Sequence, residues 1–109
     1  MYSKAHDGEK RSEQDAAFLS AIGNSKRLQL LSMISQREWS VGDLAIAVDL
    51  SQSALSQHLA RLRSMSMVET RRVNQTIFYS CKLESVRLIL EALAIIAASR
   101  DTRIAARWA

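Results

Sequence analysis

The sequence predicts a mainly α-helical domain that carries one β-hairpin, with its elements in the order ααααββα. Apolar residues recur at helical spacings of three and four along most of the chain, which contains no proline. Between residues 68 and 80 this period is lost, and two runs rich in β-branched and aromatic residues flank a short polar turn. With 109 residues, 48% of them hydrophobic and 24% charged, the chain is expected to form one globular domain.

The two ends of the chain differ in character from its middle. Residues 1–12 are polar and lack apolar periodicity, so we expect a disordered tail there. Residues 13–99 are expected to form the folded domain, and residues 100–109 a basic C-terminal tail. No run approaches the roughly 18 apolar residues of a membrane span, and the polar start does not resemble a signal peptide. The sequence therefore predicts a cytoplasmic protein that does not associate with a membrane.

Two helices are predicted at the start of the folded domain. Apolar side chains recur from Ala17 to Ile22, and Gly23 then favours the end of the first helix. Asn24 or Ser25 can cap the second helix. Its apolar stripe consists of Leu28, Leu31 and Ile34.

Two shorter helices follow, separated by a brief turn. Ser40 stands in capping-box spacing to Asp43, which predicts a third helix over residues 41–48. Ser51 offers a fresh cap and predicts a fourth helix over about residues 52–64. Two short helices joined by a tight turn have the dimensions of a helix-turn-helix.

The fourth predicted helix has one apolar and one polar face. At about 100° per residue, its apolar face is formed by Leu55, Leu59 and Leu62. The opposite face has no acidic residue and no bulky hydrophobic one, and it carries Ser53, Ser56, Gln57, Ala60, Arg61 and Ser64. Glutamine can pair with adenine, arginine with guanine, and serine with a base edge or a phosphate. The first residues of the helix present free backbone N–H groups to a phosphate.

The predicted hairpin consists of residues 68–73 and 76–80 around an Asn74-Gln75 turn. Arg71, Arg72 and Gln75 are suited to contacts with the DNA backbone or the minor groove. Residues 51–82 contain five Lys/Arg and one Glu, a local net charge of +4 that equals the net charge of the whole chain. A positive segment beside an acid-free polar helix predicts a nucleic-acid-binding surface.

Four runs of sequence are the most specific. They are NSKRL at 24–28, VGDLA at 41–45, LSQSALSQHLARLR at 50–63, and TRR with QTIFY at 70–72 and 75–79. Over about residues 14–98 the chain resembles the arsenic-repressor (ArsR/SmtB) family of winged helix-turn-helix regulators. It is most similar to the metal-independent branch that includes the nodulation repressor and the haemolysin-gene activators. The resemblance implies a homodimer joined through its first and last helices, with two recognition helices in successive major grooves.

The last predicted helix, which begins at Leu83, is apolar on more than one side. Val86, Leu90, Leu93 and Ala97 form one stripe, and Leu88, Ile89, Ile95 and Ile96 widen it. Such a helix needs both its own core and a second subunit, although a single wide core-facing stripe is the alternative. The expected dimer interface consists of Phe18, Leu19, Ile22, Val86, Leu90, Leu93 and Ala97.

The sequence departs from the metal-binding relatives. Where many of them carry Cys-Val-Cys, this chain has Ser40-Val41-Gly42, and its last helix contains no histidine. The two histidines are His6 and His58, too few for a family site, which needs three or four converging ligands. We therefore expect no metal and no other cofactor.

Four further side chains invite functional interpretations. Cys81 is the single cysteine, and a buried inert thiol is preferred to an intersubunit bridge or a modified thiol. His58 is expected to pack or to hydrogen-bond near DNA, with a pH switch as the alternative. Trp39 is expected in the core, whereas Trp108 lies in the tail and its role stays open.

The sequence predicts a transcription regulator and not an enzyme, because it has no nucleophile–base pair, paired carboxylates or glycine-rich phosphate loop. The expected DNA-binding residues are Ser51, Gln52, Ser53, Ser56, Gln57, His58, Arg61, Arg71, Arg72, Asn74 and Gln75. We expect repression through a pseudo-palindromic operator whose half-sites lie about 34 Å apart. The alternatives are activation by displacing another repressor, a protein-interaction module and architectural DNA binding. The sequence does not identify an effector.

Overall fold

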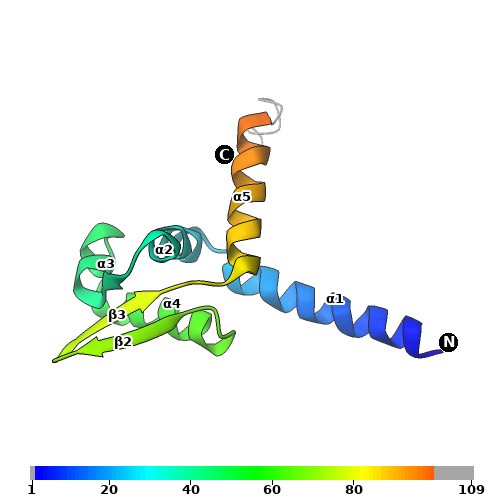
Figure 1. Ribbon diagram of the computed structural model, residues 1–109, viewed down its shortest axis with the longest axis horizontal. Helices are drawn as coiled ribbons and strands as arrows, with labels where there is room; N and C mark the ends of the chain where they lie inside the picture. Colours follow the sequence, from blue (N-terminus) through cyan, green and yellow to red (C-terminus); the bar gives the residue numbers. More distant parts are fainter. Residues whose placement is uncertain (1, 100–109) are drawn as a thin grey trace.

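A computed structural model describes residues 2–99 as five helices and a small three-stranded sheet (Figure 1). The helices are α1 (Tyr2–Ile22), α2 (Ser25–Gln36), α3 (Val41–Ala47), α4 (Gln52–Ser64) and α5 (Glu84–Ser99). The strands are β1 (Trp39–Ser40), β2 (Glu69–Val73) and β3 (Thr76–Ser80). This order confirms the predicted winged helix-turn-helix fold. The predicted basic tail, with Trp108, lies outside the described residues.

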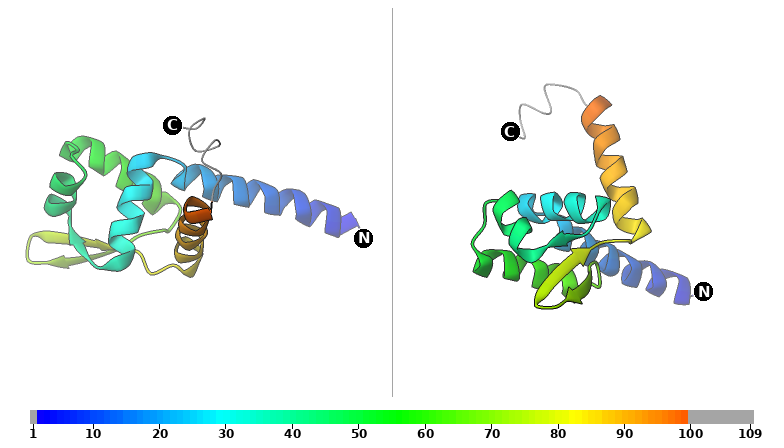
Figure 2. Two further views of the ribbon diagram at one scale, coloured as in Figure 1. Left: turned by 90° about the horizontal axis from the view of Figure 1, so that it is seen from above. Right: turned by 60° about the vertical axis from the view of Figure 1, so that its left-hand side comes forward.

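Helices α2, α3 and α4 and the sheet form the body of the molecule, from which α1 and α5 project in different directions (Figures 1 and 2). The tip of the β2–β3 hairpin and the N-terminal end of α1 lie at opposite ends of the long axis (Figure 1). The hairpin and α4 therefore lie far from the free end of α1.

None of the helices within residues 2–99 combines the length and the apolar character needed to cross a membrane.

Serine caps set the start of both helices of the helix-turn-helix. The hydroxyl of Ser40 accepts a hydrogen bond from the backbone N–H of Asp43, and that of Ser51 from the N–H of Ala54, each at 3.1 Å. Each cap satisfies one of the backbone donors that a helix leaves free at its first turn. The caps thus confirm the predicted start of both helices. At the start of α2, the cap is Asn24.

The turn between α3 and α4 is held from the neighbouring helix. Asp49 takes a left-handed φ of 54°, which aspartate tolerates better than most residues. Lys26 of α2 donates from Nζ to the carbonyl oxygen of Val48 at 2.5 Å. That carbonyl lies at the C-terminal end of α3, where the helix dipole attracts a cation. Lys26 therefore ties the C-terminal end of α3, where the turn begins, to α2.

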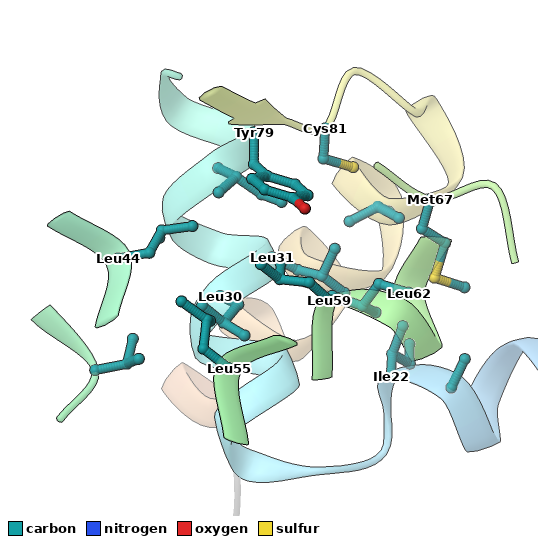
Figure 3. Close-up of a cluster of buried hydrophobic side chains, with 14 residues drawn as sticks. Ile22, Leu30, Leu31, Leu44, Leu55, Leu59, Leu62, Met67, Tyr79 and Cys81 are labelled. Atoms are coloured by element: carbon teal, nitrogen blue, oxygen red, sulfur yellow. The ribbon is translucent and has the colours of Figure 1, made fainter. Parts of the chain in front are cut away.

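The core lies between α2 and α4 and is closed by β3, α5 and the end of α1 (Figure 3). The predicted stripe of α4 is confirmed, since Leu55, Leu59 and Leu62 are at most 2% exposed. They pack in one cluster with buried residues of other elements that include Ile22, Leu30, Leu31, Ile34, Leu44, Met67, Tyr79, Cys81 and Val86. Burying these three leucines also determines which side of α4 faces solvent.

The sheet is antiparallel in the order β1-β3-β2, so β2 forms a free edge. Strand β1 was not predicted, because two residues are too few to show an alternating pattern. It pairs Trp39 with Tyr79 and Ser40 with Phe78. The indole N–H of Trp39 also donates to the carbonyl of Met33 in α2, at 3.2 Å. Trp39 is half-buried against the core, in agreement with its expected place.

The hairpin turn is the predicted Asn74-Gln75 pair. Val73 lies directly opposite Thr76, so these two turn residues form the whole connection. Asn74 takes a left-handed φ of 57°, which asparagine tolerates at a tight turn. The pairing settles the register of the hairpin.

The N-terminal segment differs from its prediction. We expected residues 1–12 to form a disordered tail, but α1 is helical from Tyr2. Residues 7–17 are all exposed, so no core contact imposes this helix. Lys, Glu, Arg, Gln and Ala, which favour helices, dominate the segment, and Arg11 lies 3.8 Å from the carboxylate of Asp15 one turn later. Local propensity without an apolar stripe sustains the helix, and the expected boundary at residue 13 falls inside it.

Candidate nucleic-acid interface

The side of α4 opposite its leucines is open to solvent. Among the expected contact residues of this helix and its cap, His58 is half-buried and the following are exposed: Ser51, Gln52, Ser53, Ser56, Gln57 and Arg61. No acidic residue lies in α4, and its last turn carries Arg61 and Arg63. The exposed face is therefore polar, uncharged at its N-terminal end and positive at its C-terminal end.

His58 and Arg61 are connected to the corner between α1 and α2. Arg27 of α2 donates from Nε to the carbonyl of Ala21 at 2.5 Å and from Nη2 to that of Ser20 at 3.3 Å. Its Nη1 lies 3.4 Å from Nδ1 of His58. Arg61 Nη2 donates to the hydroxyl of Ser20 at 3.5 Å. Sequence reasoning missed Arg27, because backbone carbonyls brought close only by folding leave no pattern in the sequence.

The strand register places the two arginines of β2 on opposite faces of the sheet. Arg72 lies directly opposite Ile77, and Arg71 lies directly opposite Phe78. Residues directly opposite each other share a face, and successive residues alternate between faces. We call the face with Ile77 and Tyr79 the inner face and the face with Phe78 the outer face. Arg72 therefore lies on the inner face and Arg71 on the outer one.

The inner face is turned toward α4. Tyr79 is buried, and its hydroxyl accepts a hydrogen bond from Nη2 of Arg63 in α4 at 2.7 Å. At the hairpin tip, Arg72, Asn74 and Gln75 are exposed. No carboxylate of the described residues lies within ion-pair distance of Arg72. The tip therefore presents an available cation and two amides.

Arg71 is engaged within the chain. Its Nε and Nη2 donate to the two carboxylate oxygens of Glu38, at 2.9 and 2.7 Å. Its guanidinium carbon lies 5.2 Å from the centroid of the Phe78 ring. The hydrogen bonds from Arg71 hold the pKa of Glu38 below its usual value. The sequence did not predict this pair, because Glu38 lies 33 positions away and outside any motif.

Cys81 is buried, as predicted. It is 4% exposed, and its backbone N–H donates to the carbonyl of Ile34 at 3.0 Å. Burial raises the pKa of its thiol, which disfavours the reactive thiolate. Its chemical inertness remains a prediction. Within the described part of the chain, no three His, Cys, Asp or Glu side chains gather where they could hold a metal ion.

The expected interface residues fall into two groups. Ile22 and Val86 are 3% and 0% exposed within the single chain, so we assign these two to its core and not to an interface. Phe18 and Leu90 are half-buried, whereas Leu19, Leu93 and Ala97 are exposed. Other exposed apolar side chains on or beside α5 are Leu83, Leu88, Ile95 and Ile96. Most of the apolar surface of α5 is thus left uncovered.

A groove of about 770 Å³ runs between α1 and α5. Its apolar lining consists of Phe18, Met65, Leu88 and Ile89. Polar residues, namely Arg11, Gln14, Asp15 and Ser85, complete its wall. The groove continues the uncovered apolar surface of α5 onto α1.

A helix-turn-helix with an exposed acid-free second helix, followed by a positively charged hairpin, defines a DNA-binding transcription regulator of the winged-helix class. Residues 24–70 match the model of the bacterial regulatory protein arsR family. The similarity to curated relatives extends over most of the chain. The protein belongs to the arsR family of bacterial transcription regulators.

Two curated relatives illustrate this membership. The chain is 53% identical to the nodulation protein NolR of Rhizobium meliloti over 81 residues, which cover 74% of this chain and 66% of the relative. It is 46% identical to the transcriptional activator HlyU of Vibrio cholerae over 85 residues, which cover 78% of this chain and 79% of the relative. The match thus spans about two thirds of the first relative and more than three quarters of the second.

Solved structures agree with this assignment. The crystal structure of NolR from Sinorhizobium fredii superimposes with a TM-score of 0.80 at 50% identity, covering 83% of this chain and 90% of that one. The homodimeric winged helix-turn-helix DNA-binding domain of Mb0332 from Mycobacterium bovis superimposes with a TM-score of 0.74 at 27% identity. That match covers 84% of this chain and 85% of the other.

Proposed function

We propose that the protein binds a pseudo-palindromic operator as a homodimer and represses transcription from it. The observation that carries this proposal is the exposed, acid-free polar face of α4, opposite three buried leucines. A helix oriented in this way can enter the major groove without placing a negative charge against the phosphates. Since DNA is the proposed ligand and the family is bacterial, we place the protein in the cytoplasm.

The residues of α4 divide into two roles. Gln57, near the middle of the exposed face, and Arg61, toward its C-terminal end, read base edges, since an amide can pair with adenine and a guanidinium with guanine. Ser51, Gln52 and Ser53 hold a phosphate at the N-terminal end of the helix, supported by its free N–H groups and positive dipole. Ser56 contributes a small hydroxyl that lets the helix approach the bases closely. His58 lies beside this face, and its contact with Arg27 supports an indirect role.

In the hairpin, Arg72, Asn74 and Gln75 contact the DNA backbone or the minor groove beside the site. The position of Arg72 on the inner face, together with its lack of an ion-pair partner among the described residues, supports this role. Each phosphate that such a cation neutralises releases counterions, so the contact adds to the salt dependence of binding.

The second copy of the chain packs on α1 and α5. The contact residues on these helices are Phe18, Leu19, Leu90, Leu93 and Ala97. The exposed apolar side chains of α5 and the adjoining groove support this interface, because a contiguous apolar patch on a soluble protein marks a binding surface. The Mb0332 domain is homodimeric, which supports dimer formation by this chain. Two-fold symmetry then spaces the half-sites about 34 Å apart along the DNA.

Repression follows from occupancy. A dimer seated on promoter DNA excludes RNA polymerase without further machinery and without a metal or cofactor. The relative HlyU is a transcriptional activator, so displacement of another repressor is the competing outcome at the promoter. Both outcomes use the same DNA contacts.

A selection from random duplex DNA tests the proposal. Full-length protein is incubated with the library at roughly 150 mM salt, with competitor DNA and a metal chelator, because weak non-specific binding is suppressed there. Enrichment of a pseudo-palindrome with half-sites one helical turn apart would support a dimeric, metal-independent regulator. Folded protein that enriches no sequence would overturn the proposal. Transcription from the selected operator, with and without the protein, then separates repression from activation.

A further inference from the structure

Three side chains form a continuous set of contacts across the outer face of the sheet. Arg71 on β2 donates two hydrogen bonds to the carboxylate of Glu38, which lies just before β1. The guanidinium of Arg71 also lies over the ring of Phe78 on β3, the strand between β1 and β2. Because the strand order is β1-β3-β2, these contacts cross the whole width of the sheet. We call Glu38, Phe78 and Arg71 the cross-sheet strap.

The two ends of the strap differ in how firmly the rest of the molecule holds them. All five residues of β2 are exposed, and this edge strand is paired only with β3. Glu38, by contrast, is followed by Trp39, which pairs with β3 and hydrogen-bonds to α2. Ser40, the next residue, caps α3, the first helix of the helix-turn-helix. The strap therefore ties the loosely held strand of the hairpin to a firmly held point beside the DNA-reading helices.

The position of Arg71 argues against a direct DNA contact. Its side chain lies on the outer face, whereas the inner face is turned toward α4. Two of its nitrogens already donate to a carboxylate, in the bidentate geometry that a phosphate would otherwise take. The carboxylate also neutralises the charge that would attract DNA. Arg72, the next residue, lies on the inner face and has no ion-pair partner among the described residues.

We infer that Glu38 and Arg71 are positioning residues, which set the angle of the hairpin relative to α4 and thereby the affinity for the operator. The inference rests on the proposed DNA-binding function. If Arg71 were a phosphate contact, Glu38 would compete with the DNA, and removing Glu38 would strengthen binding. The sign of the Glu38 effect therefore separates the two roles.

The test compares operator affinity as a function of salt for the wild type and four variants. They are Glu38→Gln, Arg71→Ala, the charge swap Glu38→Arg with Arg71→Glu, and the control Glu69→Gln. Glu69 is an exposed carboxylate of β2 that lies near Lys82 on the same face, so its loss changes the net charge beside the strap and leaves both hydrogen bonds between Arg71 and Glu38 in place. We expect Glu38→Gln and Arg71→Ala each to weaken binding by about three- to fivefold relative to the control. The slope of affinity against salt should not change, and the charge swap should restore affinity to within about twofold.

Three results would overturn the inferred positioning role of Glu38 and Arg71. The first is tighter operator binding by Glu38→Gln than by Glu69→Gln. The second is a slope of affinity against salt that falls in Arg71→Ala, as it would on the loss of a phosphate contact. The third is a charge swap that restores no operator affinity. A measurement without DNA gives an independent test. In the free protein, Glu38→Gln should speed amide hydrogen exchange in residues 69–73 relative to Glu69→Gln, and unchanged rates would also overturn it. If wild-type protein selects no operator, the proposed function fails instead, whatever the variants do to exchange.

Discussion

Helices α4 and α5 both carry a stripe of large aliphatic side chains, but the chain buries the whole stripe of α4 and only Val86, at the start, of that of α5. Leu55, Leu59 and Leu62 of α4 are at most 2% exposed, whereas Leu93 and Ile95 of α5 are 41% and 61% exposed. Helix α4 lies within the body, while α5 leaves it after its first turns (Figure 2). In α4 the apolar stripe orients a polar face toward solvent, and in α5 it forms the exposed surface itself.

An aliphatic stripe on a helix has one effect when the chain buries it and another when the chain leaves it exposed. Burying a leucine inside the chain stabilises the fold by about 1.5–3 kcal/mol, whichever partner the protein later meets. Leaving several apolar side chains together on one projecting helix reserves the same free energy for association. In the proposed function, α4 thus serves both stability and DNA readout, and α5 serves assembly.

The largest expected effect comes from breaking the buried stripe. Leu59→Ala removes a side chain that is 2% exposed and leaves a cavity between α4 and its neighbours. We expect the free energy of unfolding to fall by about 2–5 kcal/mol, measured by urea denaturation. Ala60→Ser, on the exposed face of the same helix, should cost no more than about 0.5 kcal/mol. Equal effects of the two substitutions would mean that the stripe is not what holds α4.

The exposed stripe should respond differently. Leu93→Glu places a charge in the proposed interface but outside the core of the single chain, so folding should be retained while the dimer weakens. We expect the dimer dissociation constant to rise by more than about tenfold, measured by analytical ultracentrifugation, with an unchanged helical circular dichroism spectrum. Glu91→Gln, a change of charge on the same helix, is the control. A dimer that survives Leu93→Glu unchanged would contradict the proposed interface.

On the polar side of α4, Gln57→Ala removes the proposed base contact and leaves the leucines untouched. Operator affinity should fall by about 1–3 kcal/mol, and base preference should relax at one position in each half-site. Competition with operators mutated position by position measures both quantities. Ser64→Ala, at the far end of the same face, should change neither. If Gln57→Ala binds weakly but keeps every base preference, the glutamine does not read a base.

The two arginines of β2 lie on opposite faces of the sheet and should respond differently to substitution. Arg72→Ala should weaken binding to all DNA sequences by a similar factor and lower the salt slope by about 1.8, because the dimer loses two phosphate contacts that each contribute about 0.9. Fluorescence anisotropy over a series of salt concentrations measures the slope. Arg71→Ala should leave the slope unchanged, since its guanidinium is bound to Glu38. A loss confined to the operator sequence would refute a phosphate role for Arg72.

The smallest effect concerns the charge of Glu38. Hydrogen bonds from Arg71, and the positive charges of Arg71 and Lys82, lower the pKa of Glu38 in the folded protein from an ordinary value of 4.5. The folded state therefore favours the carboxylate. The resulting stabilisation is present above pH 4.5 and is lost as the pH falls through the lowered pKa. The difference in melting temperature between wild type and Glu38→Gln should thus be constant near neutral pH and disappear in acid. A difference that grows in acid would contradict this sign.

Much of the fold could be predicted because it depends on neighbours in sequence. The caps Ser40 and Ser51, the leucines of α4 and the Asn74-Gln75 turn all act within a few residues. The acid-free face of α4 follows from the same local pattern, since the positions of the leucines determine the exposed side.

The missed features depend on contacts between distant parts of the chain or on helix propensity without an apolar stripe. The pair of Glu38 with Arg71 and the contacts of Arg27 join segments that no local period connects. The N-terminal part of α1 was missed because its polar sequence carries propensity and no periodicity. Ile22 and Val86 look like interface residues on a helical wheel, and only packing assigns them to the core.

By itself the sequence determined the order of the elements, the helix-turn-helix, and the chemistry of the face that α4 presents, because hydrophobic period and capping act within one or two turns. Only the tertiary structure decided which arginine of β2 is available, which apolar residues of α1 and α5 remain uncovered, and how the hairpin is tied to the body. Strand register and helix packing bring together residues far apart in sequence, and their geometry exists only once the chain has folded.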